Sequence, residues 1–138
     1  MATFCVKPTF DISEKGFELV SDTPFTQGDF TPQLESWLFQ YHFSNESQFY
    51  RWAADKSLAG HRHAEAMIRE QNKIPKEWRA FKLFFPATLW KDHPDNPACP
   101  EMNSRCVTCM VYHHKVGWNI SYFWGINFPL NTAIVRAV

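Results

Sequence analysis

The chain has 138 residues, of which 45% are hydrophobic and 17% aromatic, and its 14 basic side chains balance 14 acidic ones. This size and composition fit one globular domain, residues 1–138, with a substantial core. Zero net charge argues against a strong nonspecific grip on phosphates, although a local basic groove stays open. No apolar run approaches the roughly 18 residues of a membrane span, and residues 1–10 lack the pattern of a signal peptide. We therefore expect no membrane partner, and either a cytosolic protein or the effector end of a longer secreted one.

The first half of the chain predicts strands followed by a mostly helical stretch. Residues 3–7 and 16–20 have the composition of strands. Residues 31–56 are expected to be mostly helical. Four side chains there keep the i, i+3, i+4, i+7 spacing of one helix face: Leu34, Trp37, Leu38 and Tyr41.

Residues 63–71 predict a helix that follows a stop at Gly60. The segment has helix-forming composition, and Ala64, Met67 and Ile68 are spaced for one buried face. A helix that starts here presents His63 and Glu65 at its first turn.

The next two segments predict a buried strand and a long loop. Residues 80–85 form an aromatic run that is ended by Pro86, which is typical of a buried strand. Residues 87–105 contain three prolines and predict a loop, which Trp90 begins.

The last part of the chain predicts a second helix and two strands. Cys106 and Cys109 open the candidate helix at residues 106–115, where i, i+3 spacing places both sulfurs on one face. Residues 118–124 and 133–138 have the composition of strands. Only eight residues separate these two segments, too few for a helical crossover, so we expect the strands to pair antiparallel.

Four side chains have the chemistry of a hydrolytic zinc site. One imidazole and two thiolates, from His63, Cys106 and Cys109, fill three positions of a tetrahedral Zn²⁺ site. A water in the fourth position would have its pKa lowered toward neutrality by the metal. Glu65, two residues from His63, would carry protons without binding the metal.

The pattern His63-x-Glu65 with a later Cys106-x-x-Cys109 resembles the signature of the zinc-dependent cytidine deaminase superfamily. The order helix, strand, loop, helix over residues 60–122 matches that family. The resemblance implies an α/β fold of three layers, with a mixed sheet flanked by helices. One departure is Arg105, which stands where family members usually have a proline before the first cysteine.

The C-terminal part favours one branch of this superfamily. A short strand pair without a final helix is similar to free-nucleoside deaminases and to bacterial polymorphic-toxin deaminases. The irregular N-terminal half favours the toxin type, for which an immunity protein is a possible partner. The resemblance then implies conversion of cytosine to uracil in a polynucleotide, in which Glu65 moves a proton from the zinc-bound water to the departing ammonia. DNA is favoured, while RNA and an adenine target stay open.

Other residues receive more ordinary roles. Ala64, Trp90 and Arg105 are candidate substrate-binding residues, with Trp90 in the loop over the site. His61 and His93 are expected to be surface or loop residues.

Two alternatives remain open at this point. The metal site could be structural, closed by Cys99, His113 or His114 as a fourth ligand, which would make the chain a zinc-binding interaction module without catalysis. The other alternative is a deaminase of free nucleosides or nucleotides.

Overall fold

The computed structural model describes residues 2–6, 17–21, 28–36, 58–92, 105–124 and 131–138. The strands are β1 (Phe4–Val6), β2 (Phe17–Ser21), β3 (Gly28–Phe30), β4 (Pro32–Ser36), β5 (Lys82–Asp92), β6 (Arg105–His113), β7 (Gly117–Trp124) and β8 (Thr132–Ala137). The helical segments are α2 (His61–Arg69) and the 3-10 turns η2 (Gln71–Lys73) and η3 (Lys76–Ala80). In these residues no helix is long and apolar enough to cross a membrane.

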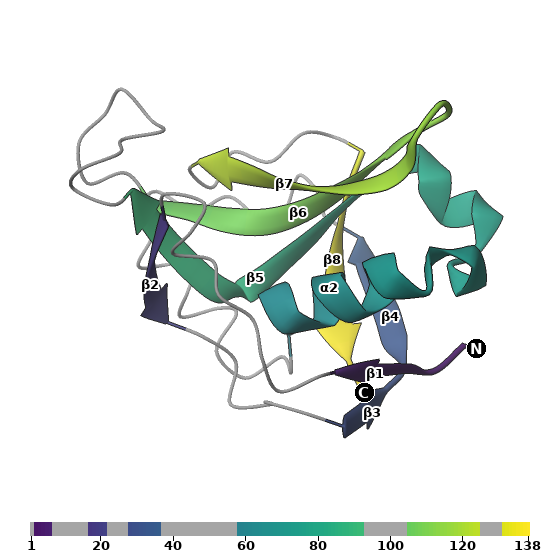
Figure 1. The fold of residues 1–138 in the computed structure, drawn as a ribbon, viewed down its shortest axis with the longest axis horizontal. Helices are drawn as coiled ribbons and strands as arrows, with labels where there is room; N and C mark the ends of the chain where they lie inside the picture. The colour runs from purple at the N-terminus through teal and green to yellow at the C-terminus, as the bar shows by residue number, and fades with distance from the viewer. Residues whose placement is uncertain (1, 7–16, 22–27, 37–57, 93–104, 125–130) are drawn as a thin grey trace.

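The described elements form an α/β fold with one large mixed sheet and few helices. Five strands follow the order β4-β8-β5-β6-β7, and β2 pairs with the far end of β5. Strands β5 and β8 are parallel, whereas the other pairs in this sheet are antiparallel. A separate antiparallel pair, β1 and β3, lies on the other side of α2 (Figure 1). The expected α/β class is confirmed, but the described helices are too sparse to show three layers.

Helix α2 was correctly predicted, with bounds two residues earlier than expected at each end. Ala64 and Met67 are fully buried, as their spacing indicated, and Ile68 packs against the same core. The helix contacts β5, β6 and β7 on one side and β1 on the other (Figure 1). Because both sides of the helix are covered, its polar side chains are held in defined positions.

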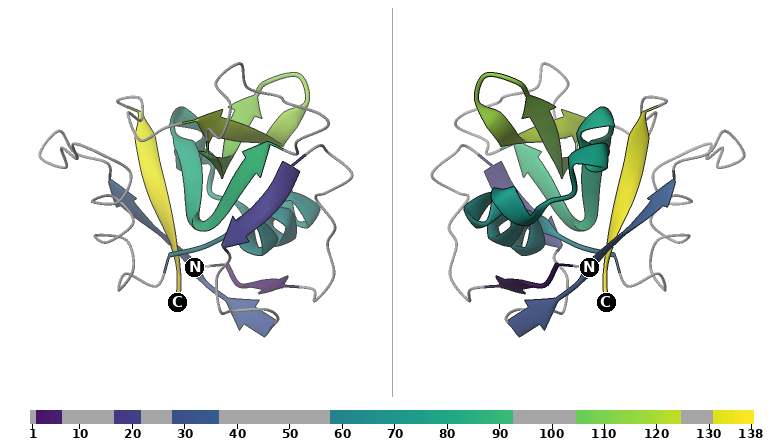
Figure 2. Two further views of the ribbon diagram at one scale, coloured as in Figure 1. Left: turned by 90° about the vertical axis from the view of Figure 1, so that its left-hand side faces the viewer. Right: turned by 90° about the vertical axis from the view of Figure 1, so that its right-hand side faces the viewer.

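Strand β5 continues past Pro86, where the sequence predicted its end. The register with β6 shifts between Phe85 and Leu89, so residues 86–88 have no paired partner in β6. Proline lacks a backbone N–H and is tolerated in a sheet at such an irregularity. Figure 2 shows β5 bending sharply. The bend lets one strand pair with β8 at its start and with β2 at its end.

Residues 106–115 do not form a helix, so that prediction was wrong. They belong to β6 and the turn that follows it. The segment contains β-branched Val107, Thr108 and Val111, which favour a pleated and buried surface. Alternation on a strand replaces the i, i+3 rule of a helix.

The two C-terminal strands are present, but the predicted antiparallel pairing between them is wrong. Strand β7 pairs with β6 through a tight turn at Gly117, whose φ of 83° favours glycine. Strand β8 lies between β4 and β5, so both its edges are occupied by other strands. Because β7 is antiparallel to β6, and β6 to β5, β7 runs parallel to β8.

The N-terminal predictions had mixed outcomes. The strands expected at residues 3–7 and 16–20 are observed as β1 and β2. Residues 32–36 form β4 instead of a helix, because their backbone pairs with β8 along five residues. The remainder of the helix predicted for residues 31–56 lies outside the described residues.

Candidate functional site

The two faces of the sheet carry different side chains around α2. Successive residues of a strand point to opposite faces. Thr108 of β6 is paired with Tyr122 of β7, and both lie on the face toward α2. Cys106 lies on that face too, whereas Cys109 packs in a cluster on the opposite face. The α2-facing side therefore combines polar and aromatic side chains.

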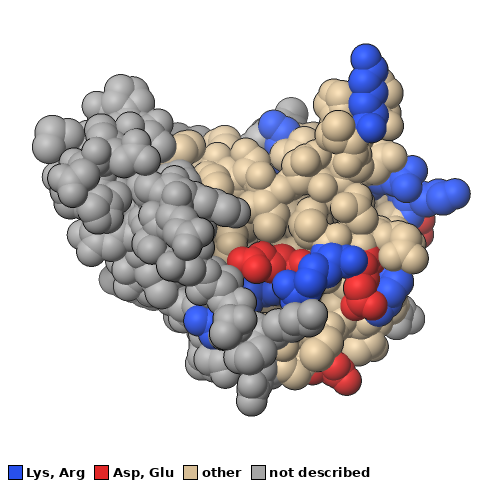
Figure 3. All heavy atoms as spheres, in the orientation of Figure 1, with Lys and Arg blue, Asp and Glu red and all other residues tan. Residues whose placement is uncertain are grey.

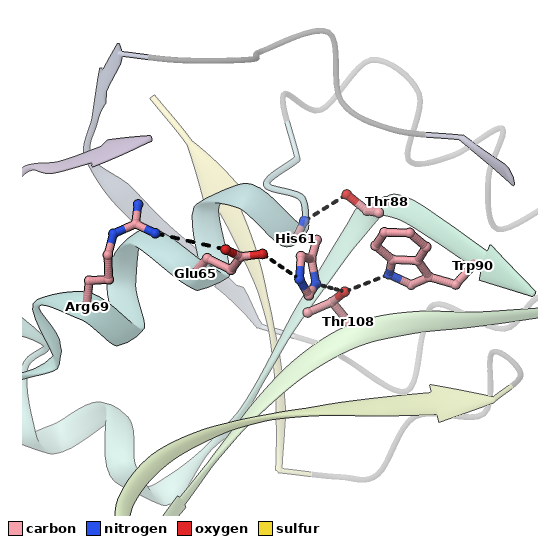
Figure 4. Close-up of polar contacts among 6 residues, drawn as sticks. All are labelled: His61, Glu65, Arg69, Thr88, Trp90 and Thr108. Carbon is pink, nitrogen blue, oxygen red and sulfur yellow. Dashed lines mark hydrogen bonds and ion pairs between the residues drawn. The ribbon is translucent and has the colours of Figure 1, made fainter. Parts of the chain in front are cut away.

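His61, the first residue of α2, lies at the centre of this side. Its side chain is 1% exposed, so the expectation of a surface or loop residue was wrong. His61 Nδ1 is 2.9 Å from Thr108 Oγ1, and His61 Nε2 is 2.9 Å from Glu65 Oε1. The i, i+4 spacing of a helix places His61 and Glu65 side by side. Figure 4 shows this arrangement.

Glu65 is the outermost member of this chain of contacts. Its side chain is 27% exposed, compared with 1% for His61. Glu65 Oε2 lies 3.9 Å from Arg69 Nη1, one helical turn further on. At this distance the guanidinium acts as a nearby positive charge and not as a hydrogen-bond donor. The carboxylate is therefore held firmly through Oε1 and more loosely through Oε2.

Trp90 is the innermost residue of this chain of contacts. Its indole Nε1 donates to Thr108 Oγ1 at 3.0 Å, and its ring meets the His61 ring edge-on at a centroid distance of 5.3 Å. Trp90 is fully buried in β5, so its predicted place in a loop over the site was wrong. The strand continues past Pro86, which brings Trp90 into the core.

One set of directions satisfies these hydrogen bonds. Indole Nε1 can only donate, so Thr108 Oγ1 accepts from Trp90. In the tautomer that carries its proton on Nε2, His61 donates to the Glu65 carboxylate and accepts the Thr108 hydroxyl hydrogen at Nδ1. The hydrogen bonds then run from Trp90 through Thr108 and His61 to Glu65.

The start of α2 is fixed by the irregular part of β5. The backbone N–H of His61 donates to Thr88 Oγ1 at 2.7 Å (Figure 4). Gly60, which precedes the helix, has no side chain to cap it, so Thr88 supplies an acceptor from another element. The backbone N–H of Ala87 also donates to the Ala59 carbonyl at 3.1 Å. Residues 86–88 thus position His61 through the backbone.

Tyr122 covers the His61 ring, with 11° between the ring planes and 6.2 Å between the centroids. Burial raises the pKa of Tyr122 well above its usual value of 10.0, and the nearby negative groups of Cys106 and Glu65 add to this. The phenol therefore stays protonated near neutral pH.

His63 is separated from the proposed cysteine ligands by its own contacts. Its Nδ1 accepts a hydrogen bond from the Gly60 backbone N–H at 2.9 Å, and its ring meets Phe30 of β3 edge-on at 4.6 Å. His63 thus lies toward β1 and β3, away from the central sheet.

The two cysteines do not meet each other either. Cys106 packs with Trp90 on the α2-facing side, and Cys109 packs with Phe84 and Ile134 on the other side. Burial raises the pKa of the Cys109 thiol from 9.0 to about 11, although a hydrogen bond with Ser121 acts in the opposite direction. The thiol form of Cys109 is therefore favoured in this apolar surrounding.

The described residues contain no group of three or more His, Cys, Asp or Glu side chains that could hold a metal ion. The residues predicted to bind zinc therefore do not fit a shared metal in this arrangement. Of the suggested fourth ligands, Cys99 lies outside the described residues. His113 and His114 are exposed and stack on each other at the β6–β7 turn, with centroids 4.9 Å apart.

The candidate substrate-binding residues are also dispersed. Ala64 is fully buried in the core on α2, and Arg105 begins β6. His93 lies outside the described residues.

The sequence contained a signal for His61 that was not used. His61 precedes Ala64 by three residues and Ile68 by seven, so it belongs to the same buried stripe of α2. A histidine in a buried stripe, four residues before a glutamate, indicates a paired imidazole. Thr108 had no such signal, because its partner Trp90 comes from another strand.

This arrangement can transfer protons through one accessible carboxylate. Only Glu65 reaches solvent, and His61, Thr108 and Trp90 hold it from behind. Comparisons with protein-family models, curated proteins and solved structures found no match for the chain.

Proposed function

We propose that the protein is a hydrolytic enzyme in which Glu65 carries the proton and His61 is the positioning residue behind it. The observation that carries this proposal is the continuous set of hydrogen bonds from buried Trp90 and Thr108 to His61 and Glu65. A buried imidazole paired with an exposed carboxylate is typical of sites that transfer protons. The same Glu65 was assigned to proton transfer from the sequence pattern.

The two carboxylate oxygens of Glu65 have separate tasks in this proposal. Oε1 accepts from His61 Nε2–H, and Oε2 is left to accept a proton from a water molecule. The water oxygen then bonds to the electrophilic atom of the substrate. Glu65 passes the proton to the leaving group as its bond breaks. Arg69 places a positive charge 3.9 Å from Oε2.

The substrate class that we propose is cytosine in a polynucleotide, with DNA favoured over RNA, and the product is uracil. Support comes from the sequence pattern that contains Glu65 and from the partly buried rings of Tyr122 and Trp124 on the same side of the sheet. A base in a duplex would have to be flipped out to react. The three-layer fold, the toxin type and an immunity protein as partner belong to this same proposal.

A zinc-dependent reaction is the second candidate. One observation favours it: Cys106 lies on the α2-facing side of the sheet, beside Trp90 of the same hydrogen-bond chain. His63 and Cys109 would have to leave their present contacts to join it. As they lie in this arrangement, these residues do not fit a shared zinc ion.

One assay tests the proposed function. Purified protein is incubated with single- and double-stranded DNA, RNA and free cytidine, and uracil or uridine is measured together with strand cleavage. Glu65→Gln should lower the rate by about 10²-fold to 10⁴-fold, because it removes the proton carrier and keeps the shape. Cys109→Ala is the matched control, and it should keep its activity within about threefold.

Two outcomes would remove the proposal. Full activity of Glu65→Gln would exclude Glu65 as the proton carrier. A wild-type protein that is inert on every substrate would favour a module that binds a partner.

A second comparison separates the two candidates. The acid–base proposal requires His61 and Thr108 and predicts no effect of chelators. The zinc-dependent candidate requires His63, Cys106 and Cys109, one zinc per chain by metal analysis, and loss of activity on chelation. Activity that survives Cys109→Ala and chelation but is lost in His61→Asn would exclude the metal.

A further inference from the structure

Positive charge is concentrated in two segments of the chain. Residues 69–82 and 113–115 hold six Lys or Arg side chains and two acidic ones, although the whole chain is neutral. The basic residues in these segments are Arg69, Lys73, Lys76, Arg79, Lys82 and Lys115, and His113 and His114 adjoin them. The rest of the chain therefore has eight basic and twelve acidic side chains.

The fold joins these two segments into one surface. The Arg79 guanidinium of η3 lies 4.3 Å from the centre of the Tyr112 ring of β6. The backbone N–H of Trp118 in β7 donates to Gln71 Oε1 of η2 at 3.0 Å. The 3-10 turns are thus attached to the β6–β7 hairpin. Figure 3 shows Lys and Arg side chains on this side of the molecule, at the right.

Several of these cations are available for a ligand. Lys76, Arg79 and Lys115 are exposed. Among the described residues, no carboxylate lies within ion-pair distance of these three side chains. Lys73 differs, because its ammonium is 3.2 Å from Glu70 and also donates to the Thr3 carbonyl. We call Lys76, Arg79, His113, His114 and Lys115 the basic surface.

Rings at the basic surface indicate what kind of polyanion it fits. His113 and His114 are exposed and stacked, with 20° between their planes. Phe81, next to η3 in the chain, is 38% exposed. Flat exposed rings stack on nucleobases that are not already stacked in a duplex. Lysine and arginine side chains neutralise the phosphates between the bases.

We propose that the basic surface binds single-stranded nucleic acid through its phosphates and bases. This inference rests on the proposed function for its biological meaning. A local basic surface would bind the phosphates of the polynucleotide substrate although the net charge of the chain is zero. Helix α2 links the basic surface to the candidate site, because Arg69 lies two residues before η2 and Glu65 lies one helical turn before Arg69. A strand bound to the basic surface would continue toward Glu65.

Binding is tested by fluorescence anisotropy with labelled single-stranded DNA and RNA, over a range of salt concentrations. The variant Lys76→Gln/Arg79→Gln/Lys115→Gln should bind about tenfold more weakly or worse at low salt. The slope of log affinity against log salt should fall by about 2, because each neutralised phosphate of a single strand contributes about 0.7. The double variant Lys76→Gln/Lys115→Gln leaves the Arg79–Tyr112 contact intact. It should show about two thirds of the slope change of the triple variant.

Glu77→Gln is the matched control, because Glu77 is an exposed acidic residue on η3. This substitution removes a negative charge and should strengthen binding slightly. His113→Ala/His114→Ala should reduce the preference for single strands over duplex. Circular dichroism confirms that each variant is folded.

Unchanged affinity and salt slope in the triple variant would overturn the proposal. Equal competition by heparin or duplex DNA would do the same, since it would show a general polyanion site. Catalysis is separate from this outcome: Glu65→Gln should bind single strands like the wild type. Binding without hydrolysis would refute the proposed function alone, and hydrolysis of free cytidine without oligonucleotide binding would refute this inference alone.

Discussion

Helix α2 and strand β6 each contain two polar residues that are three or four positions apart in the sequence, and the fold places the members of the two pairs differently. On α2, His61 and Glu65 are four residues apart and meet at 2.9 Å. On β6, Cys106 and Cys109 are three residues apart and lie on opposite faces of the sheet. A spacing of four residues therefore joins a pair on a helix, whereas an odd spacing of three separates a pair on a strand.

The difference extends to the environment of each pair. The pair on α2, His61 and Glu65, is supported by hydrogen bonds from two strands: Thr108 of β6 contacts His61, and Trp90 of β5 donates to Thr108. Cys109 is surrounded by apolar side chains, and burial raises its pKa to about 11. Polar partners thus surround the pair on α2, whereas burial on the far face of β6 opposes ionisation of Cys109.

Removal of Trp90 should have the largest effect on this comparison. Trp90→Ala should lower the free energy of unfolding by about 3–5 kcal/mol, because the ring is fully buried and its loss leaves a cavity beside His61. Urea denaturation measures the change. Trp90→Phe is the control that keeps most of the ring, and it should cost less. A loss below about 0.5 kcal/mol for Trp90→Ala would instead support the loop position of Trp90 that the sequence predicted.

The Thr108 hydroxyl can be removed with little change of shape. Thr108→Val should cost about 1–3 kcal/mol, because Trp90 Nε1 and His61 Nδ1 lose a shared partner inside the core. Thr108→Ser keeps the hydroxyl and should cost less. Nitrogen NMR of the His61 ring should show a proton on Nε2 in the wild type and a different proton distribution between Nδ1 and Nε2 in Thr108→Val. A wild-type proton on Nδ1 would contradict the assigned direction of the hydrogen bonds.

Cys109 should make stability depend on alkaline pH. Its pKa is raised from 9.0 to about 11 in the folded protein, so the thiol form contributes stability that is fully present below pH 9 and is lost as pH rises toward 11. The contribution of Cys109 to the free energy of unfolding should therefore fall by about 2 kcal/mol between pH 9 and pH 11. Denaturation curves of wild type and Cys109→Ala measure the difference. A wild type that shows no such difference from Cys109→Ala would place the thiol in a less buried or metal-bound environment.

The contact between Glu65 and Arg69 should contribute least to the stability of the protein. Arg69→Gln removes a partner that is 3.9 Å from Glu65 and lies on the surface, so it should change stability by less than about 0.5 kcal/mol. Thermal denaturation at low and high salt measures this. A cost above about 1 kcal/mol would show that Glu65 is held equally at both of its oxygens.

Local patterns in the sequence predicted the elements whose packing is local. The buried stripe on Ala64 and Met67 gave α2, and apolar runs gave β5, β7 and β8. Partner choice was not local: β8 pairs with β4 and β5, and no residue of β8 specifies this. The helix expected at residues 106–115 shows the limit, because the cysteine spacing was given more weight than β-branched Val107 and Thr108.

The site was predictable where it depended on one element. Glu65 lies on α2, as the predicted helix required, and its side chain is 27% exposed; its role in proton transfer stays a prediction. His61 lies on the same helix and was overlooked because His63 had the spacing of a known motif. Thr108 and Trp90 join the site from β6 and β5, so only the tertiary fold brings them to His61.

The hydrogen bond from the His61 backbone to Thr88 has a consequence for how the protein folds. Helix α2 has nine residues, and Gly60 gives it no side-chain cap. Isolated helices shorter than about 12 residues are marginal in water, so α2 needs the sheet in order to persist. Because Thr88 follows His61 by 27 positions, a chain emerging during synthesis cannot complete this helix until β5 has also emerged. The His61–Glu65 pair therefore forms together with the sheet. A partly made or truncated chain without β5 has no assembled site with which to act.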